Sequence, residues 1–346
     1  MRYIINILIF LSLSYTQWFS LNHDLIARSY YVSYPENISD EESIPLIINM
    51  HGFGGSALSQ RYNSEMDQFA HEQGIAVVYP QGLVNSIGYT SWNVGTYWDF
   101  SNLDDVGFIE SMINKINDDF NIDLDRVYAC GMSNGGYMSY ELACELEDKI
   151  AAFGSVTGNF MLNNSSGQLC EFTREIPFIH FHGTSDSVVD YYPPSFDGSL
   201  TVFESADFWI EYNQFNIESI EDLNNNVEIY NFSNNNSNSI FKHYKVYGGG
   251  HDWFKENWGF HTSSELIDFF LQYNLSDFYN ETTLGDINND SQINVLDVVL
   301  LAEIILEGSY LEQGDLNFDQ TISILDLIAL ITVSYTHLTL PTNREV

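Results

Sequence analysis

The sequence of 346 residues predicts an α/β fold, in which a mostly parallel sheet is covered by helices on both faces. Candidate strands alternate with candidate helices along the chain, and the strands are nearly continuous apolar runs, as expected where both faces of a strand are buried. Loops rich in glycine and histidine follow several of these strands. Since ligand chemistry on such a sheet belongs at the carboxyl ends of the strands, these loops are the candidate site.

The elements follow one another with strand and helix taking turns. The predicted strands are residues 28–34, 45–50, 75–80, 126–130, 151–156, 177–183 and 241–247. The predicted helices are residues 57–72, 104–120, 137–148 and 200–214. In the second of these helices, apolar side chains recur at helical spacing from Val106 to Phe120. The Asn-rich stretch 224–239 indicates a solvated hairpin without a function of its own.

Composition limits the partners of the chain. There are 48 acidic residues against 11 lysines and arginines, which gives a formal net charge of -37. Phosphate backbones need cationic contacts, so nucleic acid is excluded as a partner. A hydrophobic content of 45% is enough for a full-sized core and a small second domain.

The first 20 residues predict a signal peptide, because an apolar run of signal length follows an early arginine and is too short to span a membrane. The alternative is a buried first strand. We therefore expect a secreted, extracellular protein that has no membrane partner. The three cysteines suit an exported protein with one disulfide, for which we favour Cys144 with Cys170, while Cys130 packs as a small apolar side chain.

The stretch GMSNGG, residues 131–136, lies between a predicted strand and a predicted helix. Gly131 and Gly135 flank Ser133 with the G-x-S-x-G spacing of a nucleophile elbow, where small neighbours allow the chain to double back around a strained serine. An ordinary glycine-rich turn is the alternative for this motif taken alone.

Three further loops complete a catalytic pattern: HGFGG from residue 51, HGTSD from residue 182 and GGGHD from residue 248. The order Ser133, Asp186, His251 along the chain is that of the α/β-hydrolase fold. His251 would take the proton of Ser133 and Asp186 would orient the imidazole. The N–H groups of Asn134 and Phe53 would form the oxyanion hole. Taken singly, Asp186 could instead be a turn former and His251 a surface residue.

These motifs resemble those of feruloyl and acetylxylan esterases related to polyhydroxybutyrate depolymerases, over about residues 25–273. The matching stretches are HGFGG (51–55), SWNVG (91–95), DDVGFI (104–109), RVYACGMSNGGYM (126–138) and HGTSDSVVDY (182–191). The resemblance implies an extracellular serine carboxylesterase that needs no cofactor for catalysis. Asp190 stands where this family usually has proline, which puts the local loop shape in question.

An aromatic loop over residues 87–100 offers flat surfaces for a sugar ring or a phenolic acyl group. Within it Trp92 is the candidate substrate-binding residue, because it matches a position of that family. The alternative is that these rings pack against the core.

After about residue 280 the chain changes character, and a calcium-loop pattern appears twice, at residues 286–297 and 315–326. Oxygen ligands at positions 1, 3, 5, 7, 9 and 12 suit a hard cation. The predicted ligands are Asp286, Asn288, Asp290, Gln292, Asn294 and Asp297 in the first copy and Asp315, Asn317, Asp319, Thr321, Ser323 and Asp326 in the second. A random Asp/Asn-rich linker is the alternative.

Each loop precedes an apolar helical stretch, and the pair resembles a type I dockerin, the module that attaches polysaccharide-degrading enzymes to cohesin-bearing scaffolds. Ser291 and Gln320 stand where a glycine usually makes the sharp turn. The resemblance implies a small, all-α module with structural Ca²⁺ and a cohesin-bearing scaffold as partner.

The predicted organisation is a signal peptide (1–20), an esterase domain (21–278), a dockerin-like module (281–333) and a non-native tail (334–346), where the helical pattern is abandoned. The predicted function is removal of feruloyl or acetyl groups from plant or algal polysaccharide. The alternatives are a polyester depolymerase and a catalytically silent, scaffold-bound subunit.

Overall fold

The computed structural model describes residues 16–36, 38–39, 43–95, 103–161, 170, 172–193, 198–235, 240–278, 285–288, 293–317, 319 and 321–338. The chain divides into two compact units, Met1–Phe278 and Tyr279–Val346. Each is described by itself.

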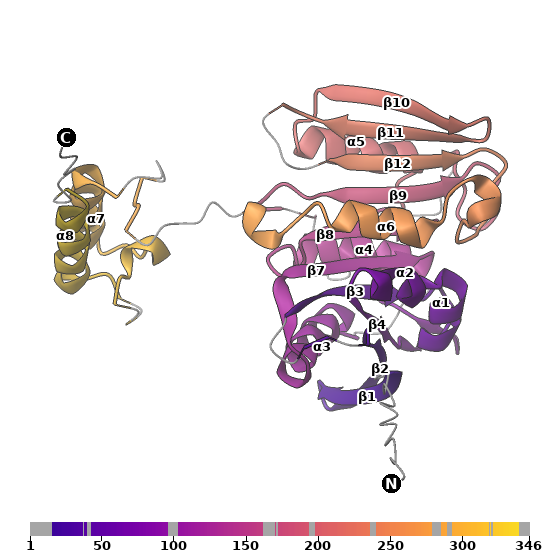
Figure 1. Ribbon diagram of the computed structural model, residues 1–346, viewed down its shortest axis with the longest axis horizontal. Helices are drawn as coiled ribbons and strands as arrows, with labels where there is room; N and C mark the ends of the chain where they lie inside the picture. The colour runs from indigo at the N-terminus through magenta and orange to yellow at the C-terminus, as the bar shows by residue number, and fades with distance from the viewer. Residues whose placement is uncertain are drawn as a thin grey trace, which may run out of the picture. The chain divides into compact units, whose positions relative to one another are not determined.

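The first unit is built around one ten-stranded sheet (Figure 1). Its strands in spatial order are β1 (Thr16–His23), β2 (Ile26–Ser33), β4 (Ala76–Pro80), β3 (Ile44–Met50), β7 (Ile122–Met132), β8 (Ala152–Val156), β9 (Phe178–Gly183), β12 (Phe241–Val246), β11 (Val227–Ser233) and β10 (Ile217–Asn224). From β4 to β12 all neighbouring strands are parallel, and the outer strands on both sides are antiparallel. A small two-stranded sheet joins β5 (Leu83–Val84) to β6 (Thr90–Ser91).

Helices cover both faces of the sheet (Figure 1). One face is covered by α3 (Asp105–Asp119), α4 (Asn134–Glu145) and α5 (Val202–Tyr212). The other is covered by α1 (Ala57–Ser64), α2 (Met66–Glu72) and α6 (Thr262–Phe270). Two short 3₁₀ helices also lie in this unit, η1 (Glu256–Trp258) and η2 (Leu275–Asp277). A third, η3 (Glu312–Gly314), belongs to the second unit. The predicted fold class is confirmed.

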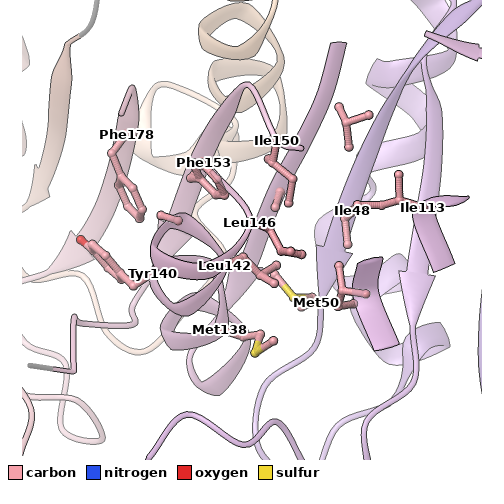
Figure 2. Packing of buried hydrophobic residues seen from close by; sticks show 14 of the residues in the cluster. Ile48, Met50, Ile113, Met138, Tyr140, Leu142, Leu146, Ile150, Phe153 and Phe178 are labelled. Carbon is pink, nitrogen blue, oxygen red and sulfur yellow. The ribbon is translucent and has the colours of Figure 1, made fainter. Parts of the chain in front are cut away.

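The central strands are buried on both sides. All seven residues of β3 are buried, with Ile48 and Met50 facing the α3–α5 side and Ile47 the opposite side. Figure 2 shows Leu142 of α4, and Leu146 directly after the helix, against the first of these layers. Burial on alternate faces explains why these strands are continuous apolar runs in the sequence.

Two boundaries differ from the sequence prediction. The predicted helix 57–72 is two helices, because Glu65 has a left-handed backbone, φ 52°, that ends α1 before α2 begins. Residues 16–20, expected within the signal peptide, form instead the first part of β1, which pairs with β2 from Thr16 to His23. The ring of Phe19 stacks on Tyr30, so this part of the chain belongs to the sheet.

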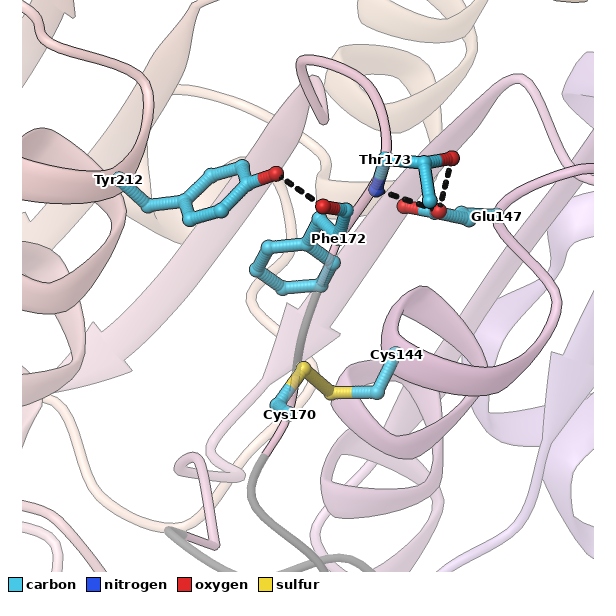
Figure 3. Close-up of a disulfide and its surroundings, with 6 residues drawn as sticks. All are labelled: Cys144, Glu147, Cys170, Phe172, Thr173 and Tyr212. Atoms are coloured by element: carbon cyan, nitrogen blue, oxygen red, sulfur yellow. Dashed lines mark hydrogen bonds between the residues drawn. A yellow bond between two sulfur atoms is a disulfide. The ribbon is translucent and has the colours of Figure 1, made fainter.

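A disulfide joins Cys144 at the end of α4 to Cys170, the pair favoured from the sequence (Figure 3). The segment that follows Cys170 is held to the same region, since Thr173 donates from its backbone and its hydroxyl to Glu147 at 2.6 and 2.5 Å. Cys130 is buried and free, and burial raises the pKa of its thiol far above the ordinary value, which makes it inert.

The hairpin of β10 and β11 turns at residues 225–226, at the start of the Asn-rich stretch. Within the described residues, β10 has a partner strand on one side only, and all eight of its residues are exposed. Glu218, Glu221 and Asp222 lie on this edge strand.

The second unit is a helix pair, α7 (Val295–Glu307) and α8 (Ile324–Leu338). Its core is built from corresponding residues of the two repeats, with Leu301 of the first and Leu330 of the second fully buried. The packing is reciprocal, because a Cβ on Gly285 would approach Leu330 and one on Gly314 would approach Leu301. Helix α8 extends to Leu338, so the first residues of the predicted tail are helical. Among the residues described here, no helix has the length and apolar run that a membrane crossing requires.

Candidate active site

The predicted catalytic residues follow strands whose carboxyl ends lie at one edge of the sheet. Ser133 follows β7, Asp186 follows β9 and His251 follows β12. These strands are parallel and lie in the order β7, β8, β9, β12, so their carboxyl ends share an edge. The HGFGG loop follows β3, which is the neighbour of β7 on the other side.

Ser133 sits in a strained turn between β7 and α4, with φ 55° and ψ −120°. Glycine is required on both sides. A Cβ on Gly131 would lie 2.4 Å from the carbonyl oxygen of Gly135, and a Cβ on Gly135 would lie 2.3 Å from that of Met50. A non-glycine residue at positive φ costs on the order of 1–3 kcal/mol and persists only where its surroundings impose it. The strand, tight turn and helix expected of a nucleophile elbow are all present.

Asp186 and His251 form a hydrogen bond, Nδ1 to Oδ2, of 2.7 Å. The second oxygen of the carboxylate, Oδ1, accepts the backbone N–H groups of Val188 and Val189 at 2.8 and 2.9 Å. The carboxylate therefore has a fixed orientation, with Oδ1 toward its own turn and Oδ2 toward the imidazole. His251 is partly exposed, whereas the Asp186 side chain is fully buried.

The charge on Asp186 is stabilised although the group is buried. Burial alone would raise the pKa of this carboxyl, but hydrogen bonds from His182, His251 and the Val188 amide outweigh burial and hold the pKa well below its ordinary value. A permanent carboxylate at this position can stabilise an imidazolium on His251.

The HGFGG loop is held in place by His51 and Trp92. The Gly82 N–H donates to Nε2 of His51 at 2.9 Å, so the ring proton is on Nδ1, which donates to the Gly52 carbonyl at 2.8 Å. Burial lowers the pKa of His51 to about 4, and the ring is neutral at pH 7. His51 thus has a structural role. Gly52 lies against the elbow, because a Cβ on it would be 3.2 Å from Cβ of Ser133.

The structure contradicts the prediction that the Trp92 side chain binds substrate, because this side chain is buried. Its side chain is 0% exposed, and its indole Nε1 donates to the His51 carbonyl at 2.8 Å. Its backbone N–H donates to Oδ1 of Asn134 at 2.7 Å, while Nδ2 of Asn134 donates to the Trp92 carbonyl. The aromatic loop turns this ring inward, where it fastens the HGFGG loop to the first residue of α4. The predicted oxyanion residues, Phe53 and Asn134, are thereby part of one connected framework.

Two other aromatic side chains are exposed beside the HGFGG loop. Phe53 is 39% and Tyr89 is 54% exposed, and their ring centroids are 5.2 Å apart. Tyr89 lies within the aromatic loop 87–100, although Trp92 was the residue predicted to bind substrate. Exposed, flat rings next to a reacting centre suit a ring-shaped part of a substrate.

In the first calcium-loop repeat, the carboxylate of Asp297 folds back over the start of the loop. It accepts the backbone N–H groups of Ile287 and Asn294 at 2.8 Å and that of Asn288 at 3.2 Å. Asp286 and Asp297 are both buried. The predicted ligands Asp290 and Gln292, and Ser291 between them, lie outside the described residues.

The second repeat has the same arrangement. Asp326 is fully buried and accepts the N–H groups of Asn317 and Ser323 at 3.2 and 2.9 Å. Asp315 is buried with it, and Asp319 accepts from Thr321. Residues 281–335 contain no lysine or arginine, so no cation of this segment balances the buried carboxylates. The residues therefore fit a bound divalent cation, which would offset the cost of burying like charges. Gln320, like Ser291, is outside the described residues.

Comparisons with known proteins agree with this geometry. The fold is that of the α/β-hydrolases. Residues 37–195 match the Phospholipase/Carboxylesterase family, and residues 284–333 match the Dockerin type I domain.

Two curated relatives are similar over part of their length. The bifunctional acetylxylan esterase/xylanase of Neocallimastix patriciarum is 28% identical over 232 residues, which cover 65% of this chain and 31% of the relative. Feruloyl esterase B of Piromyces equi is 33% identical over 164 residues, which cover 47% of this chain and 30% of the relative. The chain thus spans about a third of the length of these two relatives.

Among solved structures, the acetyl xylan esterase from Aspergillus awamori has a TM-score of 0.54 at 14% identity, over 74% of this chain and 99% of its own. A thermostable esterase has a TM-score of 0.51 at 18% identity, over 75% of this chain and 63% of its own. At these identities the likeness supports the fold alone.

Proposed function

We propose that the chain is a secreted serine carboxylic ester hydrolase that removes feruloyl or acetyl groups from plant or algal polysaccharide. The observation that carries the proposal is the Asp186–His251 hydrogen bond at the sheet edge where Ser133 occupies a strained elbow. The similarity to esterases with these activities supports the choice of substrate.

The residues would act in an acyl-enzyme cycle. The Ser133 Oγ attacks the ester carbonyl carbon and its proton passes to Nε2 of His251, while Asp186 stabilises the resulting imidazolium. The N–H groups of Phe53 and Asn134 receive the oxyanion. The tetrahedral intermediate collapses, and the leaving alcohol takes the proton from His251. Water then repeats the sequence on the acyl-enzyme and releases the carboxylic acid.

Phe53 and Tyr89 are the side chains we assign to substrate contact. Their exposed rings lie on the HGFGG loop and on the loop that packs beside it, next to the proposed oxyanion position. A phenolic acyl group or a sugar ring could stack there.

The second unit would attach the enzyme to a cohesin-bearing scaffold protein and would hold structural calcium in its two loops. Corresponding residues of the two repeats present exposed apolar side chains: Val295, Leu296 and Val299 in α7, and Ile324, Leu325 and Ile328 in α8. Exposed apolar residues repeated in this way suit a protein partner. The disulfide and the apolar start of the sequence support export.

Labelling with a fluorophosphonate probe and a hydrolysis panel test the proposal. We expect the probe to label Ser133, and methyl ferulate or acetylated xylan to be hydrolysed. Ser133→Ala should abolish both signals and leave the thermal melting curve unchanged. Hydrolysis confined to hydroxybutyrate oligomers would identify a polyester depolymerase, and absence of labelling in folded protein would indicate a catalytically silent subunit.

A further inference from the structure

A chain of hydrogen bonds between buried side chains runs from Tyr140 in the core to the turn that holds Asp186. The Tyr140 hydroxyl lies 2.7 Å from Nδ1 of His180, and Nε2 of His180 lies 3.1 Å from Nδ1 of His182. Nε2 of His182 is 2.9 Å from the Val189 carbonyl oxygen and 3.4 Å from Oδ2 of Asp186. Tyr140, His180 and His182 are all 0% exposed. Figure 2 shows Tyr140 beside Phe178 in this part of the core.

The direction of every hydrogen bond in this chain is fixed by its last member. A carbonyl oxygen only accepts, so Nε2 of His182 carries the proton. In the neutral ring Nδ1 of His182 is then an acceptor, and the proton it receives comes from Nε2 of His180. Nδ1 of His180 is in turn an acceptor, and the Tyr140 hydroxyl donates to it.

The ionisation states agree with this assignment. Burial, with the neighbouring His243 and His182, lowers the pKa of His180 well below its ordinary value, so the ring is neutral. Burial raises the pKa of Tyr140 well above its ordinary value, so the hydroxyl keeps its proton. All the donors in the chain therefore point toward the Asp186 turn.

We propose that His182 is a positioning residue, whose Nε2–H, oriented by His180 and Tyr140, holds the Asp186–Val189 turn so that the carboxylate faces His251. The Val189 amide already donates to Oδ1 of Asp186, and His182 fastens the carbonyl of the same residue. Nε2 of His182 also lies 3.4 Å from Oδ2 of Asp186, the oxygen that accepts the hydrogen bond from His251. The inference rests on the proposed function, because it assigns Asp186 to the reaction.

Substitution of His182 provides the first test. His182→Leu removes the donor, and we expect kcat to fall about tenfold or more with KM nearly unchanged, which corresponds to the loss of one hydrogen bond to a charged group. His182→Gln keeps an N–H donor near the Nε2 position and should restore kcat to within about threefold of the wild type. Equal losses in the two variants would overturn the inference, because a purely structural role does not depend on the donor.

A matched pair of tyrosine variants provides the second test. Tyr140→Phe removes the hydroxyl that fixes the His180 tautomer. Tyr191→Phe removes a comparably buried hydroxyl, which donates to Nε2 of His243 at 3.0 Å, and Nδ1 of His243 lies 3.2 Å from the backbone carbonyl of His180 rather than bonding to Asp186 or Val189. We expect only Tyr140→Phe to lower kcat, by about threefold. If both variants lower kcat equally, or neither does, the chain has no part in positioning Asp186.

Nitrogen NMR of ¹⁵N-histidine-labelled protein tests the arrangement without activity. We expect both His180 and His182 to carry a proton on Nε2, as their hydrogen-bond partners require, with assignments from the His182→Gln spectrum. A proton on Nδ1 of His182 would overturn the inference whatever the kinetics. If wild-type protein shows these tautomers but is not labelled at Ser133 by a fluorophosphonate, the proposed function fails rather than the geometry.

Discussion

His251 and Asp186 are joined by a 2.7 Å hydrogen bond although 65 residues separate them in the chain. The strands that precede them, β9 and β12, are parallel neighbours, so the fold itself brings the two loops together. The carboxylate is fixed at both oxygens, because the Val188 and Val189 amides hold the one that does not face the imidazole.

Asp186→Asn should therefore lower kcat by on the order of 10³ to 10⁴ with little change in KM. The amide oxygen of the new asparagine will occupy the position of Oδ1, where it accepts from the Val188 and Val189 N–H groups. Its NH₂ group will then face His251. The imidazole then carries its proton on Nε2 and cannot accept one from Ser133. Asp190→Asn, an exposed neighbour in the same turn, is the control and should behave as wild type in steady-state hydrolysis. Activity above a tenth of wild type in Asp186→Asn would contradict the assigned role.

Tyr89→Ala should raise KM for methyl ferulate about fivefold and leave kcat nearly unchanged, because a stacked aromatic contact contributes about 1 kcal/mol. Tyr62→Ala removes another exposed ring, on α1, and should have no effect. A KM unchanged by Tyr89→Ala would remove this side chain from the substrate site.

Trp92→Phe should lower kcat about tenfold through a looser HGFGG loop, and should reduce the free energy of unfolding by about 1–3 kcal/mol because the His51 carbonyl loses its donor. Trp209→Phe is a matched control. Trp209 is equally buried, and its indole Nε1–H donates to the Ile176 carbonyl at 3.1 Å. Both residues are far in the sequence from the HGFGG loop. We expect similar losses of stability in denaturant unfolding, but loss of turnover only for Trp92→Phe.

The first unit should lose stability as pH falls from 6.5 to 5. Burial lowers the pKa of His51 to about 4 and that of His243 to about 3, and it lowers the pKa of His180 as well. Below about pH 6.5 the unfolded chain binds protons at these residues that the folded protein does not bind. Each such histidine then costs about 1.4 kcal/mol of stability per pH unit, until its folded pKa is reached.

Denaturant unfolding at several pH values measures this slope. The double variant His243→Phe/Tyr191→Phe removes one of these histidines together with its hydrogen-bond partner. The loss of unfolding free energy per pH unit should therefore be smaller in the variant by the contribution of one histidine, about 1.4 kcal/mol. The acidic surface changes in the same way in both proteins, which leaves the difference between them to His243. Identical slopes would contradict the prediction.

Removal of calcium should lower the melting temperature of the second unit by on the order of 10 °C and leave that of the first unit unchanged. The buried carboxylates of Asp315 and Asp326 repel each other without a cation. Calorimetry of the full chain with and without chelator measures both transitions. Asp326→Ala should remove most of the calcium response, whereas Asp222→Ala on the exposed strand β10 should keep it.

Much of the fold could be predicted because burial on both faces makes the central strands continuous apolar runs. The same reasoning fails at the edges. Strand β1 (TQWFSLNH) closely follows the apolar run of the predicted signal peptide, and its adjacent Trp18 and Phe19 resemble that run in composition, so the two are hard to separate in the sequence. The break at Glu65 was also hidden, since no glycine marks this left-handed position.

At the site, spacing and order select Ser133, Asp186 and His251 as candidates, since each follows a recognisable strand, and the structure joins the last two by a hydrogen bond. Trp92 was misassigned because a loop tryptophan looks the same in sequence whether its indole faces solvent or a buried carbonyl. The hydrogen bonds through His180 and His182 correspond to a pattern that is visible in the sequence. The two histidines are two residues apart on a strand, and therefore lie on the same face of the sheet.

Within the part of the chain that the structure describes, β10 has a strand on one side only, so its outer side forms a rim of main-chain donors and acceptors that no other strand pairs with. Such a rim is a template on which a second molecule could add its own strand. The row of Glu218, Glu221 and Asp222 makes that rim repel an identical rim. Like charges along β10 therefore disfavour pairing of two copies of the protein through this strand.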